Sequence, residues 1–206
     1  MNTVITISRQ FGSGGREIGE KLAEYFNIKY YDKELLSRAA KESGFCEEII
    51  EVHDERPTSS FLYNLVMDTY SFGYNQSSFV DMPISHKIFL AQFDTIKKIA
   101  SEGPCVIVGR CADYALADMD NTLNIFIYGN EECKVKRICE RMNVNEKKAK
   151  ELSVKTDKQR QSYYNYYSSK KWGRADSYDL CINSSLLGID GTVRLLIQAV
   201  EDLESR

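Results

Sequence analysis

A glycine-rich turn directly follows the first hydrophobic segment of the chain, and it constrains the fold more than any other feature of the sequence. Residues 3–8 (TVITIS) are β-branched except for Ser8 and include Val4, Ile5 and Ile7, as expected of a strand buried on both faces of a parallel sheet. Three glycines stand among the four residues 12–15, and apolar side chains then recur at helical spacing up to Phe26. The order strand, glycine turn, helix predicts an α/β fold.

Apolar segments of strand length alternate with helical patterns along the rest of the chain. Strands are predicted at residues 3–8, 28–31, 105–108, 123–128 and 178–182, and helices at 16–26, 33–41, 84–100, from 131 onward, 145–167 and 192–203. Such alternation is typical of a parallel sheet with helices on both faces. At 206 residues the chain is predicted to form a single domain. Residues 45–83 lack a sustained period, and we expect short helices and a flexible flap there.

Composition and charge restrict the setting and the partners. No run approaches the ~18 apolar residues that cross a bilayer and no targeting segment is recognisable, so we expect a cytoplasmic protein without membrane association. The six cysteines form no CxxC pair and are expected to be free thiols. Residues 134–174 hold 13 basic and four acidic side chains, although the whole chain has a net charge of −3. This local positive charge suits a small polyanion better than a nucleic-acid polymer; a solvated helical face is the alternative interpretation.

The glycine turn is predicted to bind phosphate. Backbone N–H groups of residues 12–15 and the positive end of the following helix dipole would face a ligand above the turn. The turn nevertheless departs from the phosphate-binding motif G-x-x-x-x-G-K-[ST]. With Gly14 as the last motif glycine, Arg9 stands where the first Gly belongs and Gly15 where the Lys belongs. Arg9 or Arg16 could supply the missing charge, although a forked guanidinium is not equivalent to an ammonium group.

At this point the sequence resembles a known family. ISRQFGSGGREIG at residues 7–19, followed by YYDKELL at 30–36, closely resembles the cytidylate kinase-like family, relatives of bacterial cytidylate kinases among the P-loop nucleoside monophosphate kinases. VIVGR at 106–110 continues the resemblance, which runs through most of the chain. It implies a three-layer P-loop NTPase fold with a parallel five-stranded sheet, a helical acceptor-binding insert at about 45–83 and a basic lid at about 145–174.

The resemblance also implies roles for individual residues. Arg38 and Arg110 match family arginines that hold the acceptor phosphate, and Asp32 opens the helix that carries Arg38. Cys111 replaces the Asp of the family's Gly-Arg-Asp, and Asp113 lies two residues further on. The predicted site comprises Arg9, Gly12, Ser13, Gly14, Gly15, Arg16 and Glu17 at the donor nucleotide, Asp32, Arg38, Arg110 and Asp113 at the acceptor, and Arg16, Arg110, Asp157 and Arg160 in catalysis.

The activity implied by the resemblance is transfer of the γ-phosphoryl group of ATP to a nucleoside monophosphate, with cytidylate as the first acceptor to test. Asp157 and Arg160 match, at Asp-x-x-Arg spacing, half of the family's lid pattern. A lid of this kind contributes its charge to the phosphates only when it is closed. Mg²⁺ is expected with the nucleotide, without an assigned ligand. Two other interpretations stay open: a nucleotide-binding regulatory protein that lost transfer together with the P-loop Lys, and a kinase of a non-nucleotide small molecule.

Overall fold

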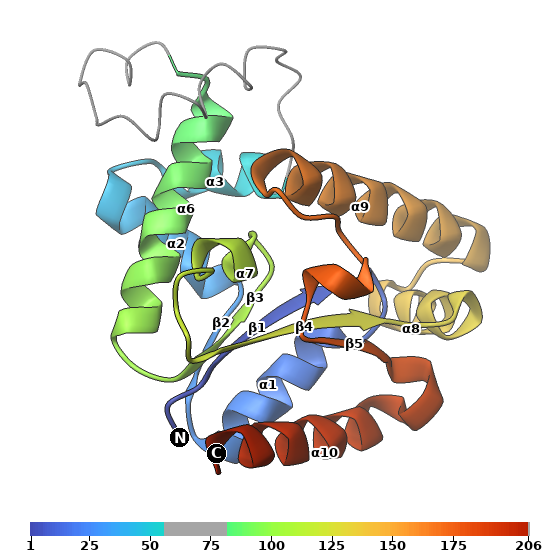
Figure 1. Ribbon diagram of the computed structural model, residues 1–206. Helices are drawn as coiled ribbons and strands as arrows, with labels where there is room; N and C mark the ends of the chain where they lie inside the picture. The colour runs from blue at the N-terminus through green and yellow to red at the C-terminus, as the bar shows by residue number, and fades with distance from the viewer. Residues whose placement is uncertain (56–81, 206) are drawn as a thin grey trace.

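A sheet of five parallel strands forms the centre of the protein (Figure 1). The computed structural model describes residues 1–55 and 82–205. The strands are β1 (Val4–Arg9), β2 (Lys29–Tyr31), β3 (Cys105–Val108), β4 (Thr122–Tyr128) and β5 (Leu180–Asn183), and their order across the sheet is β2-β3-β1-β4-β5. The predicted α/β fold with five parallel strands is confirmed.

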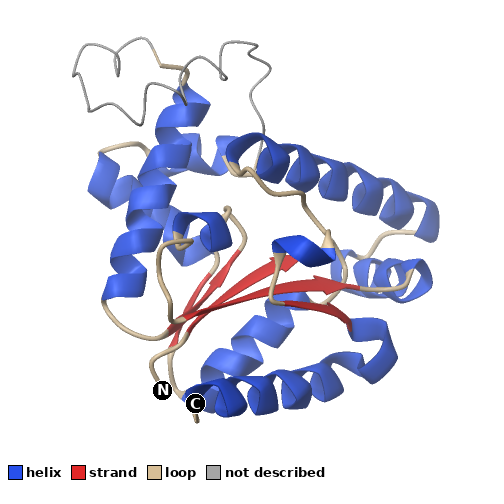
Figure 2. Cartoon of the chain, viewed as in Figure 1, coloured by secondary structure: helices blue, strands red, loops and turns tan. Residues whose placement is uncertain are grey.

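Helices cover both faces of the sheet, which makes three layers (Figure 2). One face carries α1 (Gly15–Phe26) and α10 (Ser184–Glu204), and the other carries α2 (Lys33–Ser43), α3 (Glu47–His53), α6 (Ile84–Ser101) and the short α7 (Ala112–Ala115). Helices α8 (Glu131–Met142) and α9 (Glu146–Tyr167) pack against each other, and a 3-10 turn (Ala175–Ser177) precedes β5. No helix within residues 1–55 and 82–205 is long and apolar enough to span a membrane.

The two halves of the core follow from the alternation of side chains along the strands. Ile5 and Ile7 of β1 pack with Ile18 and Leu22 of α1 on one face. Val4 points to the other face and joins the core formed with α2 and α6. Because successive strand residues face opposite sides, a strand covered on both sides needs apolar residues at nearly every position. This requirement accounts for the unbroken apolar run of β3, whereas in β1 the buried hydroxyl of Thr6 donates to the side chain of Asn124 at 2.8 Å.

Two elements begin two or more residues away from the predicted start. Strand β5 begins at Leu180, two residues later than expected, and the ring of Tyr178 lies in an aromatic cluster with Phe126 and Tyr164. Helix α10 begins at Ser184 rather than at 192, with the side chain of Asn183 accepting a capping hydrogen bond. Gly188 then interrupts the helical backbone with a φ of 68°, so regular apolar spacing is visible only beyond it.

The predicted insert and lid are described to different extents. Of the insert at 45–83, the structure describes α3, the following Asp54 and Glu55, and the residues just before α6, whereas 56–81 lie outside the described residues. The expected flap therefore stays a prediction. The lid segment corresponds to α9 and the loop after it. The side chains of Tyr163, Tyr164 and Tyr167 in the last turns of α9 are buried. Tyr167 stacks on Phe89 of α6 with ring centroids 4.0 Å apart.

Candidate phosphate-binding site

The glycine turn joins β1 to α1 at the carboxyl edge of the sheet. Gly12 and Gly14 have φ angles of 79° and 84°, which residues with a Cβ rarely adopt. A side chain at Gly12 would also overlap the backbone of Lys134 in α8. Helix α1 lacks a side-chain N-cap, and Ile18 N–H donates to Gly14 O at 2.9 Å. The amides before Ile18 have no acceptor within the helix, so they suit an anion.

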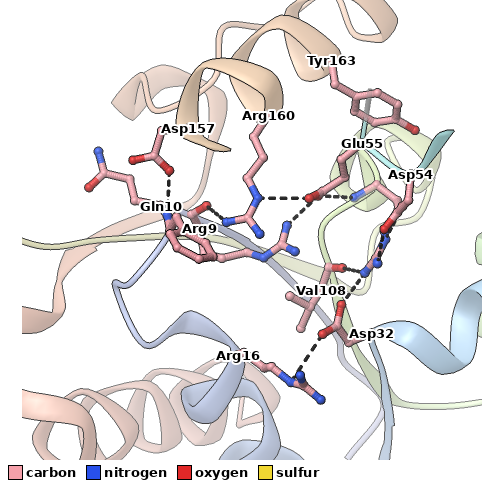
Figure 3. Close-up of polar contacts among 12 residues, drawn as sticks. Arg9, Gln10, Arg16, Asp32, Asp54, Glu55, Val108, Asp157, Arg160 and Tyr163 are labelled. Atoms are coloured by element: carbon pink, nitrogen blue, oxygen red, sulfur yellow. Dashed lines mark hydrogen bonds and ion pairs between the residues drawn. The ribbon is translucent and has the colours of Figure 1, made fainter. Parts of the chain in front are cut away.

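Three arginines with little solvent exposure lie near this turn, and Figure 3 shows two of them, Arg9 and Arg160, directed at Glu55. Arg9 ends β1, Arg110 follows β3, and Arg160 extends from α9; their side chains are 10%, 4% and 15% exposed. Because β1 and β3 are parallel neighbours, the residues at their carboxyl ends lie at the same edge of the sheet. This is the edge at which open α/β sheets bind ligands. We call Arg9, Arg110 and Arg160 the arginine cluster.

Two aspartates hold the guanidinium group of Arg110. Its Nε and Nη2 donate to both carboxylate oxygens of Asp54, at 3.0 and 2.7 Å, and its Nη1 donates to Asp32 and to Val108 O. Burial by itself lowers the pKa of Arg110, but the carboxylates outweigh it and raise that pKa well above its ordinary value. Asp32 stands at the N-cap position of α2 as predicted, yet it makes no capping hydrogen bond. Its carboxylate serves Arg110 instead.

Glu55 occupies the centre of the arginine cluster. One carboxylate oxygen accepts from Arg9 Nη1 at 2.6 Å and the other accepts from Arg160 Nε at 3.0 Å. The backbone N–H of Arg110 also donates to Glu55, at 3.4 Å. Burial by itself raises the pKa of Glu55, but Arg9, Arg160 and Arg110 outweigh it and hold that pKa below its ordinary value. A carboxylate shared by two guanidinium groups marks a position where the protein stabilises an anion.

The space between these side chains is nearly filled. A cavity of about 10 Å³ remains, lined by the arginine cluster, Glu55, Tyr163 and other residues at the carboxyl edge of the sheet. A volume of ~10–15 Å³ holds about one water molecule, whereas ligand pockets usually measure several hundred cubic ångströms. Among the residues that the structure describes, there is therefore no room beside Arg110 for a ligand larger than a water molecule unless neighbouring side chains move.

Helices α8 and α9 bring further polar groups to the glycine turn. Asp157 accepts from Phe11 N–H at 2.6 Å and from Lys134 Nζ at 3.2 Å. Lys134 Nζ also donates to Gln10, and Arg137 donates to Gly12 O. Part of the predicted positive segment therefore lies against the turn. Five other basic residues of the segment are exposed on α9, as the solvated-face interpretation expects: Lys147, Lys148, Lys150, Lys155 and Lys158.

Two predicted site residues lie away from the arginine cluster. Arg38 pairs with Glu42 on its own helix and with Glu102, which lies just before the amino end of β3. Arg110 lies just after the carboxyl end of the same strand. Glu17 is exposed on α1 and lies 3.9 Å from Lys21. The structure therefore does not bring Arg38 next to Arg110, and the role of Arg38 at the acceptor stays a prediction.

Three other predicted residues lie near the cluster with different partners. Asp113 is buried on α7, accepts from Tyr164 Oη at 2.6 Å, and has a pKa raised by burial. Arg16 is 49% exposed and reaches Asp32, with 3.5 Å between Nε and the carboxylate. Ser13 is buried in the turn, where its hydroxyl donates to Gln10 O at 2.8 Å. None of these three contacts Glu55 in the part of the chain that the structure describes.

Five residues of the site were not among those predicted: Gln10, Asp54, Glu55, Lys134 and Arg137. Lys134 and Arg137 had a sequence signal, since they open the positive segment. The two acids had none, because they lie in a stretch without periodicity and their partners are distant in the chain. Glu55 and Arg160 are 105 residues apart.

Comparisons with known proteins show the family and the fold of the chain. A cytidylate kinase of Methanopyrus kandleri is 22% identical over 216 residues, which cover 100% of this chain and 97% of the relative. The crystal structure of an uncharacterized protein from Eubacterium ventriosum shares 32% identity and a TM-score of 0.71, over 97% of this chain and 98% of the other. A shikimate kinase of Bacteroides thetaiotaomicron has the same fold, with 12% identity and a TM-score of 0.54 over 98% and 99% of the two chains. Residues 4–186 match the Cytidylate kinase-like family, and the protein, which has a P-loop kinase fold, is a member of that family.

Proposed function

We propose that the protein is a phosphotransferase that moves the γ-phosphoryl group of ATP to a nucleoside monophosphate, with cytidylate as the first acceptor to test. The observation that carries this proposal is that the guanidinium groups of Arg9 and Arg160 and the backbone N–H of Arg110 all donate to one carboxylate, that of Glu55. Phosphoryl transfer requires two anionic substrates held in line, dispersal of their negative charge, and exclusion of water. Membership of the family supports the same reaction class.

The two substrates would use different parts of the site. The amides of the glycine turn and the α1 dipole suit the donor phosphates, and the Arg110 fork suits the acceptor phosphate. In the transfer, the bond between the γ-phosphorus and the bridging oxygen of ATP breaks, a bond to an acceptor phosphate oxygen forms, and ADP leaves with the bonding electrons. The acceptor phosphate would replace Asp54 on Arg110, while Asp32 and Val108 O continue to orient its Nη1.

Arg160 links the lid helix to the reacting groups. Its Nη1 donates to Arg9 O at 3.2 Å, so α9 contacts the end of β1 directly. Burial and the like charge of Arg9 lower the pKa of Arg160. An anion placed between these two guanidinium groups relieves their mutual repulsion, and in this structure Glu55 supplies that anion. A phosphoryl group carrying more negative charge than a carboxylate would be stabilised more strongly at the same place.

Mg²⁺ would accompany the nucleotide, as in other phosphotransferases. Within residues 1–55 and 82–205, no group of three His, Cys, Asp or Glu side chains is arranged to hold a metal ion. Both oxygens of Asp157 already accept hydrogen bonds, from Phe11 N–H and Lys134. Mg²⁺ commonly binds through substrate phosphates, waters and one or two carboxylates. We therefore assign no protein ligand and route no step through the metal.

The proposal is tested with the purified full-length protein, Mg-ATP and every common nucleoside monophosphate, with shikimate and gluconate as non-nucleotide acceptors. Phosphorus NMR detects the products directly, and we expect a nucleoside diphosphate and ADP in equal amounts. Transfer only to shikimate or gluconate would show that the acceptor is a non-nucleotide small molecule, and it would contradict the proposed nucleotide acceptor. Nucleotide binding by calorimetry without any transferred phosphoryl group would contradict the proposal and support a regulatory protein.

A further inference from the structure

Positions 9 and 15 of the glycine turn face each other at short range. A Cβ atom built on Gly15 would lie 2.6 Å from Arg9 Cβ and 3.2 Å from Arg9 Cγ. The position of Arg9 Cβ is set by the backbone of β1, so no side-chain rotation of Arg9 can relieve this overlap. In this backbone, only one of the two positions can carry a side chain.

This contact connects the two departures from the motif G-x-x-x-x-G-K-[ST]. The motif has Gly at the position of Arg9 and Lys at the position of Gly15. Here Arg stands at position 9 and Gly at position 15. The cationic side chain therefore precedes the turn, whereas in the motif it follows the turn. We propose that Arg9 replaces the P-loop Lys as the cation that contacts the transferred phosphoryl group. This inference rests on the proposed function and names the residue that allows a turn without lysine to support phosphoryl transfer.

The course of the Arg9 side chain fits this role. It leads from the turn into the arginine cluster (Figure 3). Its guanidinium lies against Gly109, where any side chain would overlap both Arg9 Nη1 and the carboxylate of Glu55. Arg9 Nη1 donates to Glu55 at 2.6 Å, and Arg160 donates to the same carboxylate. A phosphoryl group in the place of that carboxylate would accept hydrogen bonds from the same two arginines.

The other cations near the turn have different partners: Arg137 donates to Gly12 O, and two more are held by carboxylates. Arg16 is 49% exposed and pairs with Glu20 and Asp32. The ammonium group of Lys134 is held by Asp157 at 3.2 Å. Neither cation is among the nearest neighbours of a side chain at position 15. The reciprocal steric relation therefore singles out Arg9.

Reciprocal substitution tests the exchange. The variants are Arg9→Gly, Gly15→Lys and the two combined, which together restore the first Gly and the Lys of the motif. Loss of one preorganised donor should lower kcat by ~10²-fold or more in Arg9→Gly. Gly15→Lys alone should also lose activity, because the new side chain overlaps Arg9. The combined variant should recover at least ~10-fold over Arg9→Gly, since a motif lysine then reaches the phosphates. A folded combined variant no more active than Arg9→Gly would overturn the proposal, as would full activity in Arg9→Gly.

Arg16 provides the competing assignment. Arg16→Ala should lower kcat less than Arg9→Gly does, and the Gly15→Lys substitution should not rescue it. If Arg16→Ala abolishes transfer and is rescued by Gly15→Lys, then Arg16 is the cation and the proposal is wrong. The dissociation constant of ATP, measured by calorimetry, should rise in Arg9→Gly and fall again in the combined variant, whether or not a productive acceptor has been found.

Thermal unfolding separates the exchange from the proposed function. Gly15→Ala adds only a Cβ, so it should lower Tm in the wild-type background and have little effect in the Arg9→Gly background. Arg194→Ala, at an exposed position of α10, is the control for loss of an arginine. Equal losses of Tm from Gly15→Ala in both backgrounds would refute the exchange even in an active enzyme. Failure of the wild type to phosphorylate any acceptor would refute the proposed function, and this cycle would still decide the exchange.

Discussion

Two arginines that resemble family phosphate-binding residues lie at opposite ends of β3. Arg38 is near the amino end, its side chain is 23% exposed, and it pairs with Glu42 and Glu102. Arg110 is at the carboxyl end, its side chain is 4% exposed, and it pairs with two aspartates. Because each arginine has two carboxylate partners, ion pairing does not distinguish a binding site from a surface cluster. Burial and position at the carboxyl edge of the sheet do so.

Solvent explains why similar partners have different consequences. Exposed ion pairs contribute ~0–1 kcal/mol, because water screens the charges and the side chains lose freedom. A buried charge that loses its partner keeps its desolvation penalty without compensation. Hydrogen bonds to Glu102 and Glu42 raise the pKa of Arg38, while carboxylates must overcome burial to raise that of Arg110. Because Arg110 is buried, leaving its charge without a partner is costly, and an anion that replaces one of its carboxylates is strongly stabilised. At the more exposed Arg38, an anion would gain little binding energy.

Replacing Arg110 should have the largest effect. Arg110→Ala leaves Asp32 and Asp54 without their shared partner, so the free energy of unfolding should fall by about 3–5 kcal/mol. Urea denaturation at pH 7 measures this loss. Arg110→Lys keeps the charge but removes the fork, so the protein should fold and bind the acceptor far more weakly, with little change for ATP. Equal losses of acceptor and ATP affinity in calorimetry would contradict the assignment of Arg110 to the acceptor.

Replacing Glu55 should have the next largest effect on stability, with a defined pH dependence. The pKa of Glu55 is lower in the folded protein than in the unfolded chain, because the arginines outweigh burial. Its contribution is therefore complete above the ordinary Glu pKa of about 4.3 and is lost as the pH falls through that value toward the folded pKa. Glu55→Gln should lower the free energy of unfolding by about 1–3 kcal/mol at pH 7. The difference from wild type should shrink below about pH 4.

The same variant sharpens the comparison between the two ends of β3. In Glu55→Gln an anion no longer has to displace a carboxylate from Arg9 and Arg160, so sulfate and inorganic phosphate should bind severalfold more tightly. Glu102→Gln, at the amino end, is the matched control and should leave anion affinity unchanged. Calorimetric titration with sulfate decides the matter: weaker binding in Glu55→Gln would mean that the carboxylate organises the site rather than occupying it.

Replacing Asp157 should have a smaller effect that reports on the contact between α9 and the turn. Asp157→Asn keeps an acceptor for Phe11 N–H but loses the charge that holds Lys134. We expect a decrease in stability of about 0.5–1.5 kcal/mol and a few-fold weaker binding of ATP. Asp176→Asn removes the charge of an exposed pair with Arg174 and serves as the control. Unchanged ATP affinity in Asp157→Asn would separate the lid helix from donor binding.

Replacing Arg38 should have the smallest effect. Its pairs are partly exposed, so Arg38→Ala should change the free energy of unfolding by no more than about 1 kcal/mol and acceptor affinity by less than about twofold. Urea denaturation and acceptor titration, run beside Arg110→Lys, measure both quantities. A loss of acceptor affinity as large as that of Arg110→Lys would show that the amino end of β3 takes part in binding, and it would break the comparison.

Much of the fold was predictable because its signals are local. The apolar runs of β1, β3 and β4 and the helical spacing in α1 and α6 depend on neighbouring residues alone. The predicted site residues at the end of β1, in the glycine turn, just after β3 and on α9 lie together: Arg9, Gly12, Ser13, Gly14, Gly15, Arg110, Asp157 and Arg160. Arg38 does not join them, because its position halfway along α2 directs it to Glu102.

The sequence by itself determined the order of strands and helices along the chain and the position of the glycine turn. Backbone conformation and side-chain periodicity depend on residues that are close in sequence. Which acids meet which arginines was settled by folding, because electrostatic energy depends on distance and burial in space. Glu55 is 46 residues from Arg9 and 105 from Arg160. The sequence also showed that position 15 lacks the motif lysine. Only the tertiary structure showed that a side chain at position 15 would overlap Arg9, so that the two positions cannot both carry a side chain.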